Sequence, residues 1–462
     1  MLKLKKSYAF YITMLLITVL TIVIMWLTFD YCDLNSMTAW TLNIWDLIFD
    51  PQMTLMNFYE YTQLNVHGAF HDNCAGNYLW LLPWCLWNFP LWLITKVFGI
   101  SNVVNIYCLL WSKLFLVLLH CGTAYLTYKI SEKLGHNQNF LAFLLMLASP
   151  EILISVGYAG QDEIVYMFCF LLAIYQLLCE KKLSAYLLCI ITVSFCPIMI
   201  LPVSVLILYG EKRIIPAVVC EMGILIPLMV FEYIYRHDSI YQNVKRVHSL
   251  TTLGSSMLNE STLDIGMGTV SICIVLCLII YFLCYTSTYV PDVRLIYYLS
   301  LMMVIINFFT TQYFYRAFLY VPFLILITTI NLSNINVNIF LLCILIYCRM
   351  FSALKVNGRQ CMNTFYVMKN SWVTKICDKL GSQRYLSENS VCLYNYFQDS
   401  SYNDLITLIT TSVAFSCGLL LLYINNPLQK RIFKFDFNYR ICVFIYIVCM
   451  PLILVAFWIM LT

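Results

Sequence analysis

The sequence predicts an all-α polytopic membrane protein with about 11–13 transmembrane helices. The chain has 462 residues, of which 62% are hydrophobic and 11% charged, and its mean hydropathy is +0.81. A soluble domain carries about 25% charged residues, because its surface must face water. Apolar runs of about 18–22 residues also recur along the chain, which is the length needed to cross a hydrocarbon core about 30 Å thick.

The apolar runs predict spans in the following order. They lie at roughly 7–29, 103–129, 138–157, 163–179, 183–196, 197–210, 214–234, 266–285, 294–311, 313–331, 337–353, 403–424 and 441–461. The first run is long and no small-residue cleavage site follows it, so we expect a retained anchor and not a cleaved signal peptide.

Lysine and arginine residues predict the orientation of these spans. MLKLKK at the N-terminus and the segments 129–136, 180–182, 211–213 and 429–440 fall on one side, which is therefore expected to be cytoplasmic. The basic stretch RHDSIYQNVKRVH (236–248) falls on the opposite side in this arrangement. Joining 183–196 and 197–210 into one span would move that stretch and everything after it to the other side, so both arrangements stay open.

The chain is predicted to form a single membrane domain over residues 1–462. It divides into the first span (1–29), an outer loop (30–102), a transmembrane module (103–331) and C-terminal helices (332–462) that carry an outer loop at 354–402. The net charge of +4 lies in the loops, so membrane lipids and not nucleic acid are the expected surroundings. A bias towards Ile, Asn, Tyr and Lys points to an AT-rich bacterial genome, and hence to a bacterial plasma membrane.

The first outer loop gathers four aspartates just after the first span, in FDYCDLNSMTAWTLNIWDLIFD (29–50). Five apolar residues in it have helical spacing: Met37, Trp40, Ile44, Leu47 and Ile48. Asn43, Asp46 and Asp50 fall on the other face, which predicts an amphipathic helix in the membrane interface with the two aspartates solvated. Residues 77–99 are interrupted by Pro83 and Pro90, so we expect a pair of surface-lying or partly inserted helices there.

Two histidines, His67 and His71, lie in the loop between these helices. Their spacing of four would place both on one face of a helix and could hold a metal ion, but Gly68 favours a loop. They are candidates for substrate contact in a cavity open to the outer leaflet. Because no compact set of ligands occurs, no divalent metal and no other cofactor is expected.

Four segments resemble the C-type glycosyltransferases, integral membrane enzymes that use polyprenyl-phosphate sugars, and among them the mannosyltransferases. The segments are DYCDLNSMTAW (30–40), NYLWLLPW (77–84), SPEILISVGYAGQDE (149–163) and FYRAFLYVPFLI (314–325). Their order matches that family, as does an acid at the outer end of the first span. The resemblance covers roughly the first two thirds of the chain and stops at about residue 335.

The resemblance implies an inverting transfer of sugar from a polyprenyl phosphate to a glycan, protein or lipid acceptor at the extracytoplasmic face. The essential acid beyond the first span would be Asp33 or, second, Asp30. Substrate contacts would fall at Gln161, Asp162, Glu163 and Arg316. The chain departs from the family pattern by offering four acids in the first loop and by lacking the frequent glycine-aromatic ending of its first interfacial helix.

The chemistry of this transfer fits those residue types. A carboxylate must take the proton from the acceptor hydroxyl as the new bond forms, and a cation must stabilise the leaving phosphate. Each residue also has a structural reading: Asp33 as the N-cap of a helix beginning near Ser36, Asp162 and Glu163 as acids at a helix start, and Arg316 as a side chain that reaches the headgroups. Lys113, midway along an apolar run, is expected in a structural ion pair.

Two other functional classes remain open. A multi-span transporter or lipid-linked glycan flippase would bury paired charges at mid-membrane and show repeat symmetry, and the sequence shows no such repeat. A polysaccharide polymerase would favour arginine-rich outer loops, and residues 30–102 contain no arginine.

Overall fold

The computed structural model describes most of the chain and confirms an all-α polytopic membrane protein. The described residues are 2–30, 32–69, 74, 77–100, 106–135, 138–158, 160–251, 262–264, 269–287, 292–310, 320–364, 366–367, 402–428, 432–433 and 437–461. Two short antiparallel strand pairs accompany the helices: β1 (Phe29–Asp30) with β4 (Tyr366–Val367), and β2 (Thr262–Asp264) with β3 (Thr269–Ser271).

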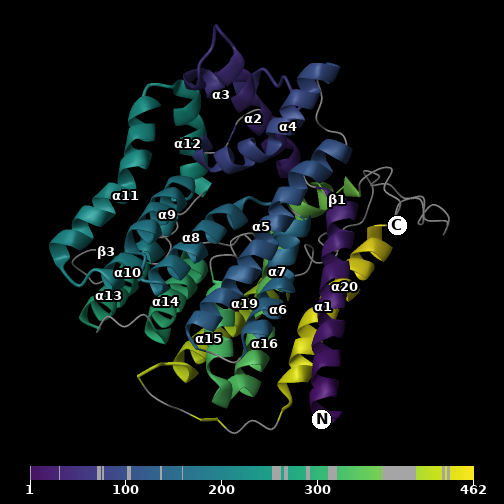
Figure 1. Cartoon of the computed structure of the whole chain (residues 1–462), viewed down its shortest axis with the longest axis vertical. Helices are drawn as coiled ribbons and strands as arrows, with labels where there is room; N and C mark the ends of the chain where they lie inside the picture. The colour runs from purple at the N-terminus through teal and green to yellow at the C-terminus, as the bar shows by residue number, and fades with distance from the viewer. Residues whose placement is uncertain are drawn as a thin grey trace. The chain divides into compact units, whose positions relative to one another are not determined.

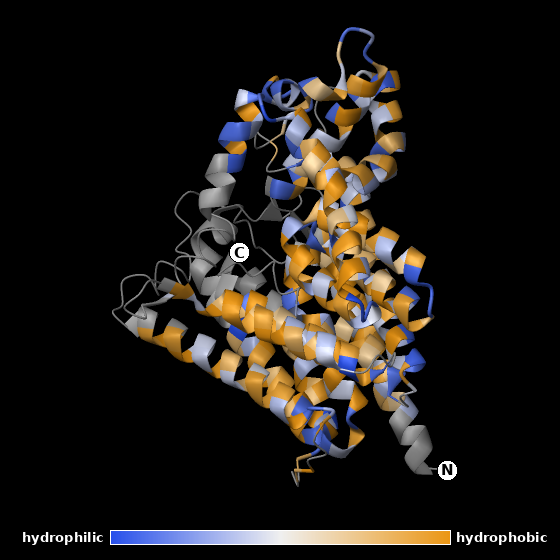
Figure 2. Cartoon of the chain, turned by 90° about the vertical axis from the view of Figure 1, so that its left-hand side faces the viewer, coloured by the Kyte–Doolittle hydropathy of each residue, from blue (hydrophilic) through white to orange (hydrophobic). Residues whose placement is uncertain are grey.

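Several helices are long and apolar enough to cross a membrane. Among the described residues, five qualify alone: Tyr8–Leu27, Tyr78–Phe98, Tyr107–Lys133, Ile214–Ile234 and Leu332–Met350. Figure 2 shows hydrophobic residues over most of the helical surface and hydrophilic ones gathered at loops and helix ends. Helices that present apolar residues outward in this way are suited to a lipid environment.

The described chain forms two compact units, and the chain passes between them four times. Unit 1 comprises residues 1–31, 116–161 and 312–462. Its elements are α1 (Leu2–Thr28), α6 (Asn139–Leu147), α7 (Pro150–Leu153), the π-helix η3 (Ile154–Tyr158), α15 (Val321–Ile330), η7 (Leu332–Asn334), α16 (Ile335–Thr364), α19 (Tyr402–Ile424) and α20 (Tyr439–Leu461), with β1 and β4. Helix α5 (Ile106–Lys133) begins in unit 2 and ends in unit 1.

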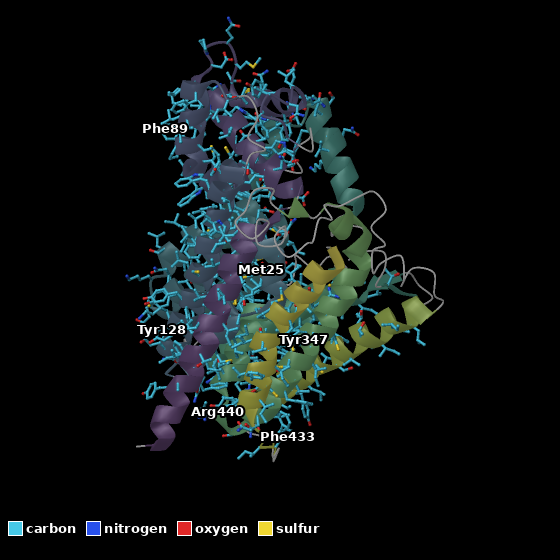
Figure 3. All side chains as sticks on the ribbon, turned by 90° about the vertical axis from the view of Figure 1, so that its right-hand side faces the viewer. Met25, Phe89, Tyr128, Tyr347, Phe433 and Arg440 are labelled. Atoms are coloured by element: carbon cyan, nitrogen blue, oxygen red, sulfur yellow. The ribbon has the colours of Figure 1, made fainter. Side chains whose placement is uncertain are left out.

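Hydrogen bonds join the apolar helices of unit 1; Figure 1 traces the course of these helices. The amides of Asn338 in α16 and Asn425 bond each other reciprocally, at 2.9 and 3.0 Å. Tyr347, labelled in Figure 3, donates from α16 to the Tyr446 carbonyl of α20 at 3.1 Å. Such bonds stabilise helix contacts in membranes, where the hydrophobic effect does not drive helices together.

The predicted span 138–157 is one broken helix. Helix α6 ends at Leu147, and the chain bends by 41° before the segment that begins at Pro150. Proline lacks a backbone N–H, and it disfavours the helical conformation of the preceding residue, Ser149. Beyond the break, Gly157 lies so close to α1 that a Cβ atom there would come within 3.1 Å of the Cβ of Met25, which Figure 3 labels.

Unit 2 comprises residues 32–115 and 162–311. Its elements are α2 (Cys32–Phe49), η1 (Leu55–Asn57), α3 (Phe58–Gln63), η2 (Tyr78–Leu81), α4 (Leu82–Phe98), α8 (Glu163–Leu178), α9 (Lys182–Phe195), η4 (Pro197–Met199), α10 (Ile200–Gly210), α11 (Ile214–Ile234), α12 (Ser239–Thr251), α13 (Ile272–Thr286) and α14 (Val293–Thr310), with β2 and β3. We call α2, α3, α4 and the described segments between them the first-loop cap.

Helices α9 and α10 form a hairpin, which excludes the arrangement that joins 183–196 and 197–210 into one span. Lys182 at the start of α9 forms an ion pair of 3.0 Å with Glu211, just beyond the end of α10. The Tyr186 hydroxyl donates to the same carboxylate at 2.8 Å. The two helices therefore begin and end at the same end of the unit.

Further contacts lie at the same end of unit 2, which holds Lys182, Glu211 and Lys212. We call it the basic end of unit 2. Lys212 donates to the Cys284 carbonyl at 2.8 Å, so α13 ends here. The Tyr209 hydroxyl donates to Asp292 at 3.2 Å, so α14 begins here. The basic residues of the segments 180–182 and 211–213 thus share one end, as the sequence predicts.

Helix α11 carries the chain away from the basic end to the first-loop cap. After it, the Tyr235 hydroxyl donates to the Leu55 carbonyl at 2.6 Å and lies 3.3 Å from the Tyr78 hydroxyl. The rings of Tyr59 and Tyr241 pack with centroids 5.0 Å apart, which joins α3 to α12. The stretch 236–248 therefore begins beside the first outer loop, despite its basic residues.

The first-loop cap differs from its prediction in two ways. Helix α2 does not present a solvated face, because Asn43 and Asp46 are buried together with Trp40 and Ile44. Residues 82–98 form one continuous helix: Pro83 lies at its first turn, where a proline is tolerated, and Pro90 is inside it. Helix α4, which contains Pro90, packs against α2.

Candidate functional site

A single buried carboxylate, Asp46, holds three parts of the first-loop cap together. Its Oδ1 accepts hydrogen bonds from Trp92 Nε1 at 2.8 Å and from Lys96 Nζ at 2.6 Å, both on α4. Its Oδ2 lies 2.6 Å from His67 Nε2 and accepts a bond from the Tyr61 hydroxyl at 3.2 Å. We call these five residues the Asp46 centre.

The hydrogen-bond donors around Asp46 determine the pKa of its carboxyl group. Burial acts to raise the pKa of Asp46, but the hydrogen bonds from His67, Lys96 and Trp92 outweigh it and lower that pKa to about 2. The carboxylate is therefore ionised at neutral pH, and both of its oxygens are engaged. Such a group is a poor general base, because it cannot readily take up a proton.

This arrangement corrects the prediction that Asp46 lies on a solvated helix face. Helical spacing identifies the residues that share a face, but it does not show whether another helix covers that face. Here α4 covers it, and Trp92 and Lys96 come from a segment far along the chain. Asp50, one turn further, is partly exposed and accepts a bond from the Gln52 backbone N–H at 2.7 Å, which closes a turn.

The two predicted bases lie at the start of the loop. Asp33 is in the first turn of α2 and partly exposed, whereas every residue from Leu34 to Ile44 is buried. Since α2 begins at Cys32, Asp33 is not the N-cap of a helix beginning near Ser36, although the helix dipole still favours its charge. Asp30 is part of strand β1, and only its backbone is among the described parts of the structure.

The structure does not bring His67 to Asp33. His67 binds Asp46, which lies on the same helix as Asp33 but thirteen residues further along it, an axial distance of about 20 Å. His67 is buried, and its Nδ1 has no hydrogen-bond partner among the described residues. His71 lies outside the described residues.

The segment 160–163 forms a turn and the start of α8. Gly160 has a φ of +62°, a conformation that favours glycine, and Gln161 is buried, with its backbone N–H bonded to Ser155. Asp162 occupies the N-cap position of α8 without a side-chain capping bond, and Glu163 is the first helical residue and buried. Within unit 2, burial and then the Asp162 carboxylate raise the pKa of the Cys74 thiol, so Asp162 lies near Cys74, which belongs to the segment between α3 and η2.

Protein families, curated proteins and solved structures gave no match to this chain. Among the described residues, no three His, Cys, Asp or Glu side chains are grouped closely enough to hold a metal ion.

A second buried carboxylate, Glu151, lies in unit 1 at the break between α6 and α7. It accepts a hydrogen bond of 2.5 Å from the Tyr320 hydroxyl and interacts electrostatically with Arg349 of α16. Glu151, Tyr320 and Arg349 are at most 5% exposed. The sequence contains a signal for this pair, since each charged residue interrupts an apolar run; Arg316, the predicted phosphate ligand, lies outside the described residues.

Lys113 also lies inside the protein. It is fully buried in α5, beside Ser112, which accepts a hydrogen bond of 2.8 Å from Thr38 of α2 and one of 3.2 Å from Asn88 of α4. Ser112 therefore joins α2 and α4 to α5 beside this buried lysine. The predicted ion pair of Lys113 stays a prediction. Among the described residues, the buried carboxylates are thus Asp46, Glu151 and Glu163.

Proposed function

We propose that the protein is a membrane glycosyltransferase that moves a sugar from a polyprenyl phosphate to an acceptor at the extracytoplasmic face. Asp33 is the general base, with Asp30 as the second choice. The acceptor is a glycan, a protein or a lipid, and the reaction inverts the anomeric carbon.

The observation that carries this proposal is that the first-loop aspartates differ in their hydrogen bonds and in their exposure. Asp46 is saturated by four donors and Asp50 closes a turn. Asp33 is partly exposed, at the start of the helix that follows the first span. A base must meet its acceptor hydroxyl, so partial exposure next to a membrane span suits a substrate that is half lipid.

The arrangement of unit 2 supports the membrane orientation that this function needs. The basic end and the first-loop cap lie at opposite ends of α11, a helix of 21 residues. Positive residues favour the cytoplasmic side, so the cap would face the extracytoplasmic side and the N-terminus the cytoplasm. About 11–13 helices would then cross a bacterial plasma membrane.

The test is sugar transfer by the purified full-length chain from a panel of polyprenyl-phosphate sugars. Wild type is expected to transfer one of them, and Asp33→Asn to lose at least about a hundredfold in rate, the contribution typical of a general base. Asp50→Asn is the matched control, because it makes the same substitution at an aspartate of the same loop and is expected to retain activity.

Each outcome of this test has a distinct meaning. Full activity of a folded Asp33→Asn protein would move the base to Asp30 and contradict the assignment. A wild type that is inert towards every donor, while thermally stable in the same detergent, would contradict glycosyl transfer itself.

A second candidate function, transport or flipping of a lipid-linked glycan, is favoured by the Glu151–Arg349 pair. Transporters bury ionisable groups inside the helix bundle, where such groups mark substrate pathways. Both residues are at least nine-tenths buried within unit 1. Movement of a fluorescent lipid-linked sugar across vesicles that contain the protein, without sugar transfer, would select this candidate.

A further inference from the structure

Three sulfur-containing side chains meet inside unit 2 and form what we call the sulfur cluster. Cys273 and Cys277 belong to α13, and Met302 belongs to α14. The Cys277 thiol donates to the Met302 Sδ at 3.6 Å, and it shares a side-chain hydrogen bond with the Cys273 thiol. All three residues are at most 4% exposed. Two thiols and a thioether therefore lie in contact, away from solvent.

The cluster arises from the spacing of the two cysteines and from the packing of two helices. Residues four apart lie on one face of a helix, so ICIVLCLII (272–280) places Cys273 and Cys277 on the same face of α13. Helix α14 packs against α13 and brings Met302 from 25 residues further along the chain. The sequence thus contains a signal for the cysteine pair, but none that links Met302 to it.

The hydrogen bonds of the thiols distinguish this cluster from a cysteine that only fills space. Cys284, two turns further along α13, is also buried, and its thiol donates to the Val205 carbonyl at 3.3 Å. The Cys277 thiol donates instead to sulfur, which is a weak acceptor. A group of sulfur atoms that contact one another gains little from hydrogen bonding, but it is well suited to hold a soft metal ion.

The number and type of the ligands indicate which ion this would be. Thiolate and thioether sulfurs select soft ions such as Cu(I), whereas Mg²⁺ and Ca²⁺ take oxygen ligands. Structural zinc and iron–sulfur clusters take four protein ligands. In the part of the chain that the structure describes, no third His, Cys, Asp or Glu side chain joins the two thiols. Three sulfur ligands, one of them a thioether, favour Cu(I).

The geometry of the cluster fits an ion of this kind. Metal–sulfur bonds of about 2.3 Å place the corners of a planar three-coordinate site about 4 Å apart. The Cys277 and Met302 sulfurs are 3.6 Å apart, so they need to separate by only a few tenths of an ångström. The thiol hydrogens leave when a metal ion binds, and the ion takes their place between the sulfurs. Met302 has three rotatable side-chain bonds, so its sulfur can turn to complete the triangle with Cys273.

We propose that the sulfur cluster binds one Cu(I) ion through the thiolates of Cys273 and Cys277 and the thioether of Met302. The two thiol protons pass to the solvent as the ion binds, and no electron is transferred. Cys273 is in the first turn of α13, where the helix dipole favours the negative charge of a thiolate. The bound ion fastens α13 to α14. This site is independent of sugar transfer, because none of its residues belongs to the first-loop cap.

The experiment titrates Cu(I) into the reduced full-length chain in detergent, without oxygen and in competition with a coloured Cu(I) chelator. Wild type is expected to take up one equivalent more than Cys277→Ala, because the cysteines outside the cluster are the same in both proteins. Cys284→Ala makes the same change at a buried thiol of the same helix and is the matched control, which should take up as much as wild type. Equal uptake by wild type and Cys277→Ala, or an equal loss in both variants, would overturn the proposal.

A second variant protects the test against a loss of folding. Met302→Leu keeps the volume of the side chain and both thiols, so it is expected to fold as wild type does. It is expected to bind Cu(I) at least about tenfold more weakly, since even the loss of an outer partner of a metal ligand weakens binding by about that factor. Unchanged affinity in Met302→Leu would remove the thioether from the site and contradict the three-sulfur assignment.

X-ray absorption at the copper edge identifies the ligands directly. Wild type loaded with one equivalent of Cu(I) should show three sulfur atoms at about 2.3 Å, and Met302→Leu should show two. Nitrogen or oxygen ligands in wild type would overturn the assignment to the sulfur cluster. Zn²⁺ offered in the same way should be taken up equally by wild type and Cys277→Ala; an equivalent of zinc lost in the variant would contradict the choice of Cu(I).

Discussion

At the scale of the single residue, Asp46 shows how a carboxylate can be buried without a catalytic role. Its four donors come from α3, the following loop and α4, so one side chain fixes the relative positions of three segments. The carboxylate contributes to stability because its replacement leaves buried donors without an acceptor. The size of this contribution can be measured.

We expect Asp46→Asn to lower the free energy of unfolding by about 2 kcal/mol, since the amide can accept only part of the four bonds. Asp50→Asn, which loses only a bond to an exposed turn, should change it by less than about 0.5 kcal/mol. Thermal unfolding of the two variants in one detergent measures the difference. Equal melting temperatures would show that the Asp46 centre does not stabilise the cap.

The pKa of Asp46 predicts a pH dependence with a definite sign. It is lowered to about 2 in the folded protein, below the value of about 3.9 expected in an unfolded chain. The stability that it confers is therefore fully present above about pH 4 and is lost as the pH falls towards 2, a change of roughly 2–3 kcal/mol. Unfolding curves at about pH 6 and pH 3 should show roughly half of this loss, about 1 kcal/mol, in wild type and a smaller loss in Asp46→Asn; parallel losses would assign it to other groups.

At the scale of the helix, apolar runs predict where a helix begins and ends, but they do not predict which of its side chains other helices bury. The predicted spans 163–179, 214–234 and 294–311 match α8, α11 and α14 to within a residue at each end, because the length of an apolar run sets the length of the helix. The burial of Asp46 could not be predicted, since Trp92 and Lys96 lie far along the chain and no local pattern links them to it. For the site, the position of Asp33 follows from the end of the first span. The burial of Glu151 could not be predicted in this way, because its partners Tyr320 and Arg349 lie far along the chain.

Two glycines in helical segments predict opposite effects of the same substitution. A Cβ atom at Gly157 would meet Met25 at 3.1 Å, so Gly157→Ala must displace α1 by a few tenths of an ångström, and we expect a loss of about 1 kcal/mol. Gly223 in α11 has nothing within 4 Å of that position, so Gly223→Ala should be neutral or stabilising by up to about 1 kcal/mol. Melting temperatures of the two variants test this, and a rise for Gly157→Ala would contradict the close packing.

At the scale of the whole molecule, the contacts of Tyr235 and Lys182 predict which loops share a side of the membrane. Epitope tags inserted after Gln52 and after Asp238 should both be reached by antibody in intact cells, because these segments belong to one end of unit 2. A tag inserted between Glu180 and Lys181 should be reached only after permeabilisation, because Lys182 belongs to the basic end. A tag at Asp238 that needs permeabilisation would contradict the orientation.

The pairing of β1 with β4 also has a consequence for biosynthesis. Phe29 pairs with Val367 and Asp30 with Tyr366, so the segment that leaves the first span is completed by a strand made near the end of translation. The ribosome must therefore deliver most of the helices to the membrane before the backbone beside Asp33 acquires its final hydrogen bonds. A chain released prematurely before residue 366 would carry its first span and its aspartates and still lack this closing strand.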